Sequence, residues 1–79
     1  MRLLDEDIDR ACSRVTIYLT HQEAVELRDS LEALVAGPSG GHEHVSDADY
    51  KKEITVCLYD SVELSEFSDR SRRLIELDK

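Results

Sequence analysis

The sequence predicts a small α+β protein, a two-layer sandwich in which two helices cover one face of a three-stranded mixed sheet. Two observations lead to this prediction. Alternating apolar residues mark strands at 14–19 and 53–59, whereas apolar residues at helical spacing mark a helix at 21–36 and another near the C-terminus. With a short strand at 42–46, the predicted order of elements is β-α-β-β-α.

The segment 14–38 has the strongest local pattern in the chain. Apolar residues alternate with polar or aromatic ones over 14–19, which is the period of a half-buried strand. Thr20 and Glu23 then form a capping-box pattern, in which each side chain bonds the backbone amide of the other residue. Apolar residues at helical spacing follow, and a glycine and a proline end the helix: Ala24, Leu27, Leu31, Leu34, Val35, Gly37 and Pro38.

The middle of the chain predicts a β-hairpin after a flexible linker. Residues 37–41 form this linker, because they contain all three glycines and the only proline. Residues 42–46 are the first strand of the hairpin, and residues 47–52 are a loop of about six residues in which aspartate side chains bond nearby amides. Residues 53–59 form the clearest strand, so we expect the two strands to pair antiparallel.

The C-terminal part predicts a second helix that begins after Asp60 and Ser61, which can cap it. Its later turns are basic, a placement that favours the negative end of the helix dipole. One face of this helix is formed by Leu64, Phe67, Ser71, Leu74 and Ile75, and the basic residues are Arg70, Arg72 and Arg73. Residues 1–13 are expected to be an N-terminal segment, either a short helix or a frayed tail, and residues 14–79 a single α+β domain.

The rules of strand connection place the third strand, 53–59, in the middle of the sheet, with the other two on either side. This strand is also the most apolar of the three, as a central strand should be. Both helices then bury the same face of the sheet. The predicted core is Val15, Ile17, Leu19, Ile54, Val56 and Leu58 against Leu27, Leu31, Leu34, Phe67 and Leu74.

Size and charge limit the possible functions. A chain of 79 residues buries only about 60% of its unfolded surface, so a partner chain would add to its stability. Its net charge is −8, from 18 acidic and 10 basic residues, which argues against nucleic acid and anionic membranes as partners. The same charge favours a basic protein as partner.

The N-terminus and the cysteines indicate the compartment of the protein. No apolar run approaches the length of a membrane span, and Asp5 to Asp7 leave no room for the apolar region of a signal peptide. We therefore expect a cytoplasmic protein. Cys12 and Cys57 belong to no Cys-x-x-Cys motif and are expected to stay reduced.

The second face of the predicted sheet is open and rich in tyrosine and histidine. Tyrosine offers a large contact area with a polar tip, so such a face is often an interface. We expect a protein contact there, most simply a homodimer, whose formation would also enlarge the small core. The residues on this face are Thr16, Tyr18, Thr55, Tyr59, His42, His44 and Cys57.

A metal site is the second hypothesis for this face. In a strand, His42 and His44 point the same way, and Cys57 on the neighbouring strand offers a third ligand for zinc. Asp47 or Asp49 could supply a fourth. No second pair of ligands at fixed spacing accompanies this pair, so the alternative is a polar strand that enters a turn.

No pattern in the chain indicates an enzyme. Cys57 with His44 as a base is the only conceivable nucleophile, but no glycine near either cysteine suggests an oxyanion hole. A semi-buried structural cysteine is the simpler interpretation. Phosphate-binding glycine loops and the common hydrolase motifs are absent, so we expect neither catalysis nor a bound cofactor, zinc excepted.

The sequence therefore predicts a small acidic, non-enzymatic protein-interaction module, such as an inhibitor or regulator of a basic partner protein. The alternatives are a metal-responsive module that binds zinc through the His-x-His strand, and a structural homodimer. The expected partner-binding residues lie on the acidic helix and the acidic loop: Glu23, Glu26, Asp29, Glu32, Glu43, Asp47 and Asp49.

Overall fold

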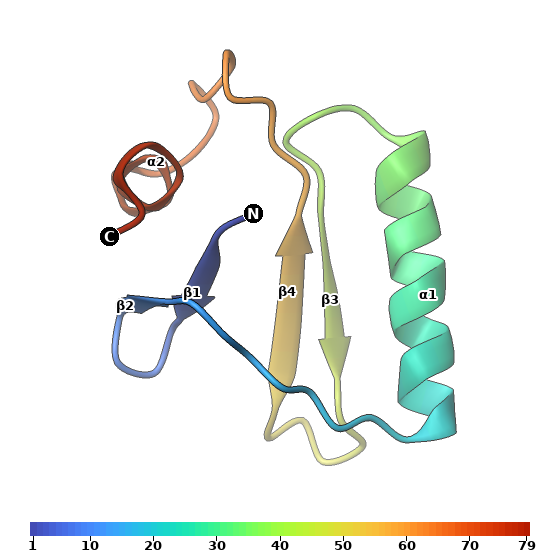
Figure 1. The fold of residues 1–79 in the computed structure, drawn as a ribbon. Coiled ribbons are helices and arrows are strands. Elements are labelled where there is room, and N and C mark those ends of the chain that lie inside the picture. The colour runs from blue at the N-terminus through green and yellow to red at the C-terminus, as the bar shows by residue number, and fades with distance from the viewer. The chain divides into compact units, whose positions relative to one another are not determined.

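The computed structural model describes residues 1–79 and confirms the α+β class. Two helices and four strands are present, and the strands form two separate two-stranded antiparallel sheets (Figure 1). The predicted single three-stranded mixed sheet is therefore wrong. The chain divides into two compact units: residues 18–60, called here the helix–hairpin unit, and residues 1–17 with 61–79, called the terminal unit.

The helix–hairpin unit begins with α1, His21–Ala36, whose ends match the predicted signals. The Glu23 amide donates to Thr20 Oγ1 at 3.2 Å, and the Thr20 amide donates to Glu23 Oε1 at 2.9 Å. The Gly37 amide donates to the Leu34 carbonyl at 3.1 Å at the other end. The predicted capping box and stop are thus confirmed, because both depend on residues that are neighbours in sequence.

Strands β3, His42–Ser46, and β4, Glu53–Cys57, form the predicted antiparallel hairpin. Backbone bonds between Leu58 and the glycines continue the ladder beyond the strands: Gly40 N to Leu58 O, and Leu58 N to Gly41 O. Gly40 has a φ of 91°, a conformation that residues with a Cβ rarely adopt.

The loop between β3 and β4 uses an aspartate as predicted. Asp47 Oδ1 accepts the amides of Lys51 at 2.8 Å and Lys52 at 3.2 Å. The Tyr50 amide bonds the Asp47 carbonyl at 3.1 Å, and Tyr50 itself has a φ of 55°. One aspartate side chain therefore satisfies two loop amides, which lets a tyrosine occupy the left-handed position.

The core of the helix–hairpin unit lies between α1 and one face of the hairpin. Leu34 and Val45 are its buried residues, 7% and 6% exposed. Ile54 and Val56 are half-buried. Leu31 was predicted in this core but is 45% exposed. A two-stranded sheet is only about 10 Å wide, so it covers a narrower part of the helix than three strands would.

Residues 14–19 form no strand, which contradicts the predicted first strand. Val15 and Ile17, expected in the core, are 59% and 46% exposed. Alternation shows which side chains would share a face, but a strand also needs a neighbour to accept its backbone hydrogen bonds. The hairpin closes over a short loop, whereas the predicted pairing of 14–19 required a crossover through a whole helix.

The terminal unit contains a second hairpin in place of the short helix or frayed tail expected for residues 1–13. Strands β1, Leu3–Asp5, and β2, Arg10–Cys12, pair antiparallel. Asp5 Oδ1 accepts the Asp7 amide at 3.0 Å, and Asp9 has a φ of 53°, so two aspartates shape the turn. The helix-like spacing of apolar residues in this segment is outweighed by this turn chemistry.

Helix α2, Asp69–Leu77, begins later than predicted. Ser68 is its N-cap and accepts the Ser71 amide at 3.1 Å, so Asp60 and Ser61 do not cap it. Ahead of the helix, the Glu63 carboxylate accepts both the amide and the hydroxyl of Ser65. Such local bonds compete with helix formation, and they keep Leu64 and Phe67 outside α2.

The late start of α2 also changes where its arginines lie. No basic residue occupies the last turn of the helix, so the predicted match between the arginines and the C-terminal dipole is wrong. Arg72 instead pairs with Asp69 in the first turn. Leu74, predicted in the core, is the buried residue of α2 at 9% exposed.

Within the terminal unit, two arginines connect the β1–β2 hairpin with α2. Arg2 Nε donates to the carbonyls of Leu74 and Ile75, each at 3.1 Å, near the end of α2. Arg70 Nε lies 2.6 Å from Asp9 Oδ1, and this hydrogen bond is the chief cause that holds the pKa of Asp9 below its ordinary value. Two arginine side chains therefore link the β1–β2 hairpin to α2.

Candidate interaction surfaces

The negative charge of the chain is concentrated in the helix–hairpin unit. Residues 18–60 contain nine acidic and three basic residues, a net charge of −6, whereas the terminal unit contains nine acidic and seven basic residues, a net charge of −2. Any electrostatic attraction of a basic partner therefore arises mainly from this unit.

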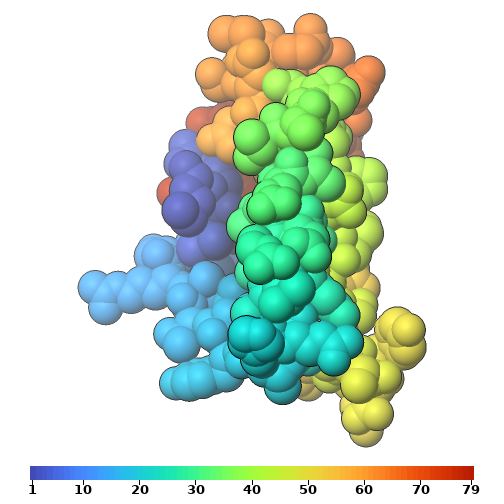
Figure 2. Space-filling view, turned by 90° about the vertical axis from the view of Figure 1, so that its right-hand side faces the viewer, coloured from blue at the N-terminus to red at the C-terminus, as the bar shows by residue number.

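On α1, the predicted acidic residues divide into two groups. Glu23 is half-buried, and its carboxylate bonds the Thr20 amide, so it serves the helix cap. Glu26, Asp29 and Glu32 are exposed. Arg28 lies beside this group and pairs with Asp29 at 3.1 Å. Figure 2 shows the side of α1, in teal to green, that forms an outer surface of the unit.

The acidic residues of the hairpin are less available for a partner than predicted. Asp47 is half-buried and occupied by two loop amides. Glu43 is half-buried on β3, and Asp49 is exposed in the loop. The exposed cations Lys51 and Lys52 follow in the same loop, so this end of the hairpin has mixed charge. The structure thus leaves the outer side of α1 as the more uniform acidic surface.

The exposed face of the hairpin brings together the residues of the predicted metal site. His42 lies opposite Cys57 in the register, and the rings of His42 and His44 are 5.3 Å apart between centroids. His44 Nδ1 lies 2.8 Å from both Thr55 Oγ1 and Glu53 Oε1. His44 is therefore engaged with the neighbouring strand.

No group of three or more histidine, cysteine, aspartate or glutamate side chains is placed to hold a metal ion. Zinc binding by His42, His44 and Cys57 stays a prediction that requires their side chains to rearrange. Zinc that binds in a one-to-one ratio and is lost in a His42→Ala/His44→Ala variant would support it. An affinity unchanged in that variant would exclude these ligands.

The predicted tyrosine interface loses part of its basis. Since 14–19 is not a strand, alternation no longer places Thr16 and Tyr18 on a sheet face with Thr55. Tyr18 is 91% exposed, Tyr59 is half-buried beyond the end of β4, and Thr55 is exposed on β4. Their contact with a partner stays a prediction, now without a common sheet.

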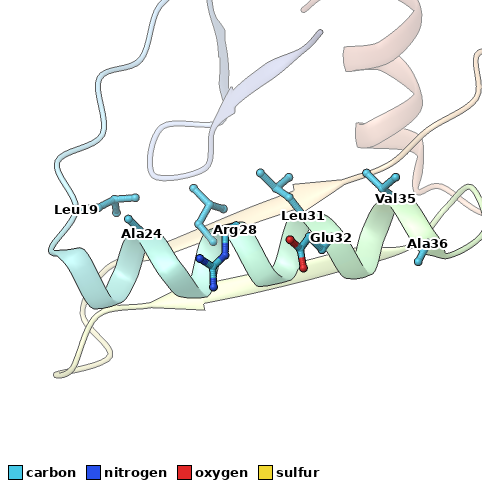
Figure 3. Close-up of a pocket in the computed structure, with 8 residues that line it drawn as sticks. Leu19, Ala24, Arg28, Leu31, Glu32, Val35 and Ala36 are labelled. Atoms are coloured by element: carbon cyan, nitrogen blue, oxygen red, sulfur yellow. The ribbon is translucent and has the colours of Figure 1, made fainter.

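A further surface lies on α1 and was not predicted. The apolar stripe, defined here as Leu19, Ala24, Leu31 and Val35, lines an open hollow of about 640 Å³. Figure 3 shows these four side chains on one side of the helix, with Arg28 and Glu32 next to each other beside them. Val35 is 80% exposed. Leu19 precedes the cap and Ala24 follows it, a pair typical of a hydrophobic staple.

The sequence contains a weak signal for this stripe. The helical pattern of α1 predicts one apolar face, of which Leu27, Leu31 and Leu34 were expected to pack on the sheet. Leu34 is buried, whereas Leu31 and Val35 are exposed, so the narrow hairpin covers only one edge of that face. Only knowledge of the sheet width could have separated the covered edge from the open one.

Neither cysteine forms a disulfide: Cys12 is half-buried and Cys57 is exposed. Neither helix is long and apolar enough to cross a bilayer. No protein-family model, curated protein or solved structure matches the chain.

Proposed function

We propose that this protein is a small, non-enzymatic interaction module that binds a basic partner protein through the outer side of α1. The observation on which the proposal rests is the net charge of −6 within residues 18–60. Concentrated charge of one sign steers an oppositely charged partner and accelerates its association.

The placement of the acidic side chains supports α1 as the contact surface. Glu26 and Asp29 are exposed and lie on the side of the helix turned away from the apolar stripe, about 180° and 120° around the axis from Val35. Glu32 lies at the border between the two surfaces. No exposed lysine belongs to α1, and Arg28 is paired with Asp29. A basic surface that approaches this side therefore meets mainly carboxylates.

The test is capture of a partner from an extract of the source cells at low salt, with the whole protein immobilised. The test variant is Glu26→Gln/Asp29→Asn, which removes two charges from α1 without changing side-chain size. The matched control is Glu6→Gln/Asp7→Asn, which removes two exposed charges from the terminal unit. Both variants have the same net charge.

We expect a basic protein that is retained by the wild type and the control, reduced in the α1 variant, and released by added salt. Equal loss in both variants would mean that net charge alone governs retention, and the assignment to α1 would be wrong. Capture of no basic protein by the wild type would contradict the proposed function itself.

A further inference from the structure

The apolar stripe has a pattern of side chains that fits a second copy of itself. Ala24, Leu31 and Val35 lie within about 40° of one another around α1. Arg28 and Glu32 flank them on the same side, one turn apart and of opposite charge. Glu32 takes part in none of the ion pairs of the chain.

An antiparallel pair of α1 helices brings unlike side chains together. With a twofold axis level with residue 30, Arg28 of each copy lies opposite Glu32 of the other. The same symmetry places Leu31 next to its own counterpart. Val35 then lies within about 1.5 Å, along the helix axis, of the level of Ala24 in the other copy, so that a larger apolar side chain meets a smaller one. Large residues meet small ones without any change to the helix, and Arg28, which pairs with Asp29 within one chain, meets Glu32 of the other copy.

We propose that a second copy of this chain covers the apolar stripe, forming a homodimer with twofold symmetry through antiparallel α1 helices. The proposal does not depend on the basic partner, because Glu26 and Asp29 lie on the other side of α1. It differs from the interface predicted from the sequence, which used the sheet face with Thr55 and Tyr59.

The small core gives a reason for this association. Only Leu34, Val45 and Leu74 are buried, and no side chain is fully buried. Covering Leu31 and Val35 removes further apolar surface from water. A helix of 16 residues is about 24 Å long and offers less than the roughly 800 Å² per partner of a standard interface. We therefore expect a weak dimer, with a dissociation constant between about 10 μM and about 1 mM.

The first experiment measures the mass of the full chain by sedimentation velocity under reducing conditions, over about 10 μM to about 1 mM. Arg28→Glu and Glu32→Arg each place like charges at both symmetry-related contacts. Each should weaken the dimer about tenfold, and the double variant Arg28→Glu/Glu32→Arg should restore it. Glu66→Arg in the terminal unit has the same charge change as Glu32→Arg and should not weaken the dimer.

The second experiment tests the position of the twofold axis by a disulfide. In a Cys12→Ser/Cys57→Ser background, Leu31→Cys places two thiols close to the axis, within reach of an S–S bond. Oxidised glutathione should therefore convert this variant to a covalent dimer, with release of reduced glutathione. Gln22 is exposed and lies about 120° around the helix from Arg28, so Gln22→Cys should remain largely monomeric. Circular dichroism confirms that each variant is folded.

Three results would overturn the inference. A wild-type chain that stays monomeric at every concentration would show that no second copy covers the stripe. A dimer that is indifferent to both charge reversals, or that the double variant fails to restore, would lie elsewhere. Equal cross-linking at positions 22 and 31 would show that the contact does not have this symmetry.

Discussion

Single residues decide how much of the predicted acidic surface is free to bind. Glu23 and Asp47 were expected to contact a partner, but their carboxylates bond backbone amides of the chain itself. The capping-box pattern already indicated this use for Glu23, because the motif requires that bond. The role of Asp47 follows from the same turn chemistry that predicted the loop. The other predicted contact residues are available to a partner only where their side chains are exposed, and exposure cannot be read from a sequence pattern alone.

At the residue scale, Asp9 predicts a pH dependence of stability. Its hydrogen bond from Arg70 lowers the pKa of the folded carboxyl below the unfolded value of about 3.9. A lowered folded pKa adds stability above the unfolded pKa, and this stability is lost as the pH falls through the folded pKa. Asp9→Asn should therefore lower the melting temperature slightly at pH 7, with little effect at about pH 2.

Thermal unfolding followed by circular dichroism between about pH 2 and 7 tests this prediction. Glu6→Gln is the control, since Glu6 is exposed in the same turn and forms no ion pair. A loss for Asp9→Asn that is the same at all pH values would contradict the assigned role of the Arg70 contact.

At the scale of elements, the predictions that were confirmed are those that depend on contacts between residues close together in sequence. α1 and the β3–β4 hairpin were predicted because a cap, a glycine stop and a short loop depend on neighbouring residues. The strand at 14–19 was wrong because its alternation implied a partner far away in sequence. The predicted start of α2 was wrong because two serines could cap the helix. Ser68, rather than Ser61, is the N-cap.

The cap of α1 gives the first prediction for an element. Thr20→Ala removes the acceptor for the Glu23 amide and should lower the free energy of unfolding by about 1 kcal/mol. Thr20→Ser keeps the hydroxyl and should have most of the wild-type stability. Urea denaturation measures both, with the exposed Thr16→Ala as the control outside any element. A Thr20→Ala variant as stable as the wild type would contradict the capping box.

The two edges of the apolar face of α1 give a second prediction for an element. Leu34 is 7% exposed, so Leu34→Ala should destabilise the fold by about 2–5 kcal/mol. Val35 is 80% exposed, so Val35→Ala should change the stability of the monomer by less than about 0.5 kcal/mol. Denaturation in dilute solution compares the two. Similar losses for both variants would mean that the two side chains are buried alike and that the stripe is not open.

At the scale of the whole molecule, the sequence established the net charge and predicted the α+β class. It did not predict the division of the chain into two compact units. Its net charge and α+β content follow from composition and local patterns. Long-range pairing decides that two sheets form instead of one, and that residues 18–60 form one compact unit whereas residues 1–17 and 61–79 form another. Local patterns do not encode such pairing strongly. The open stripe on α1 follows from the first of these differences, because a two-stranded sheet covers less of the helix than three strands would.

The charge concentrated in residues 18–60 is the basis of the proposed function. The most direct test is the association rate of the captured basic partner with the whole protein, measured by stopped flow at increasing salt. We expect the rate to fall steeply with ionic strength for the wild type and less steeply for Glu26→Gln/Asp29→Asn. A rate independent of salt, with the same value for both proteins, would contradict electrostatic binding by α1.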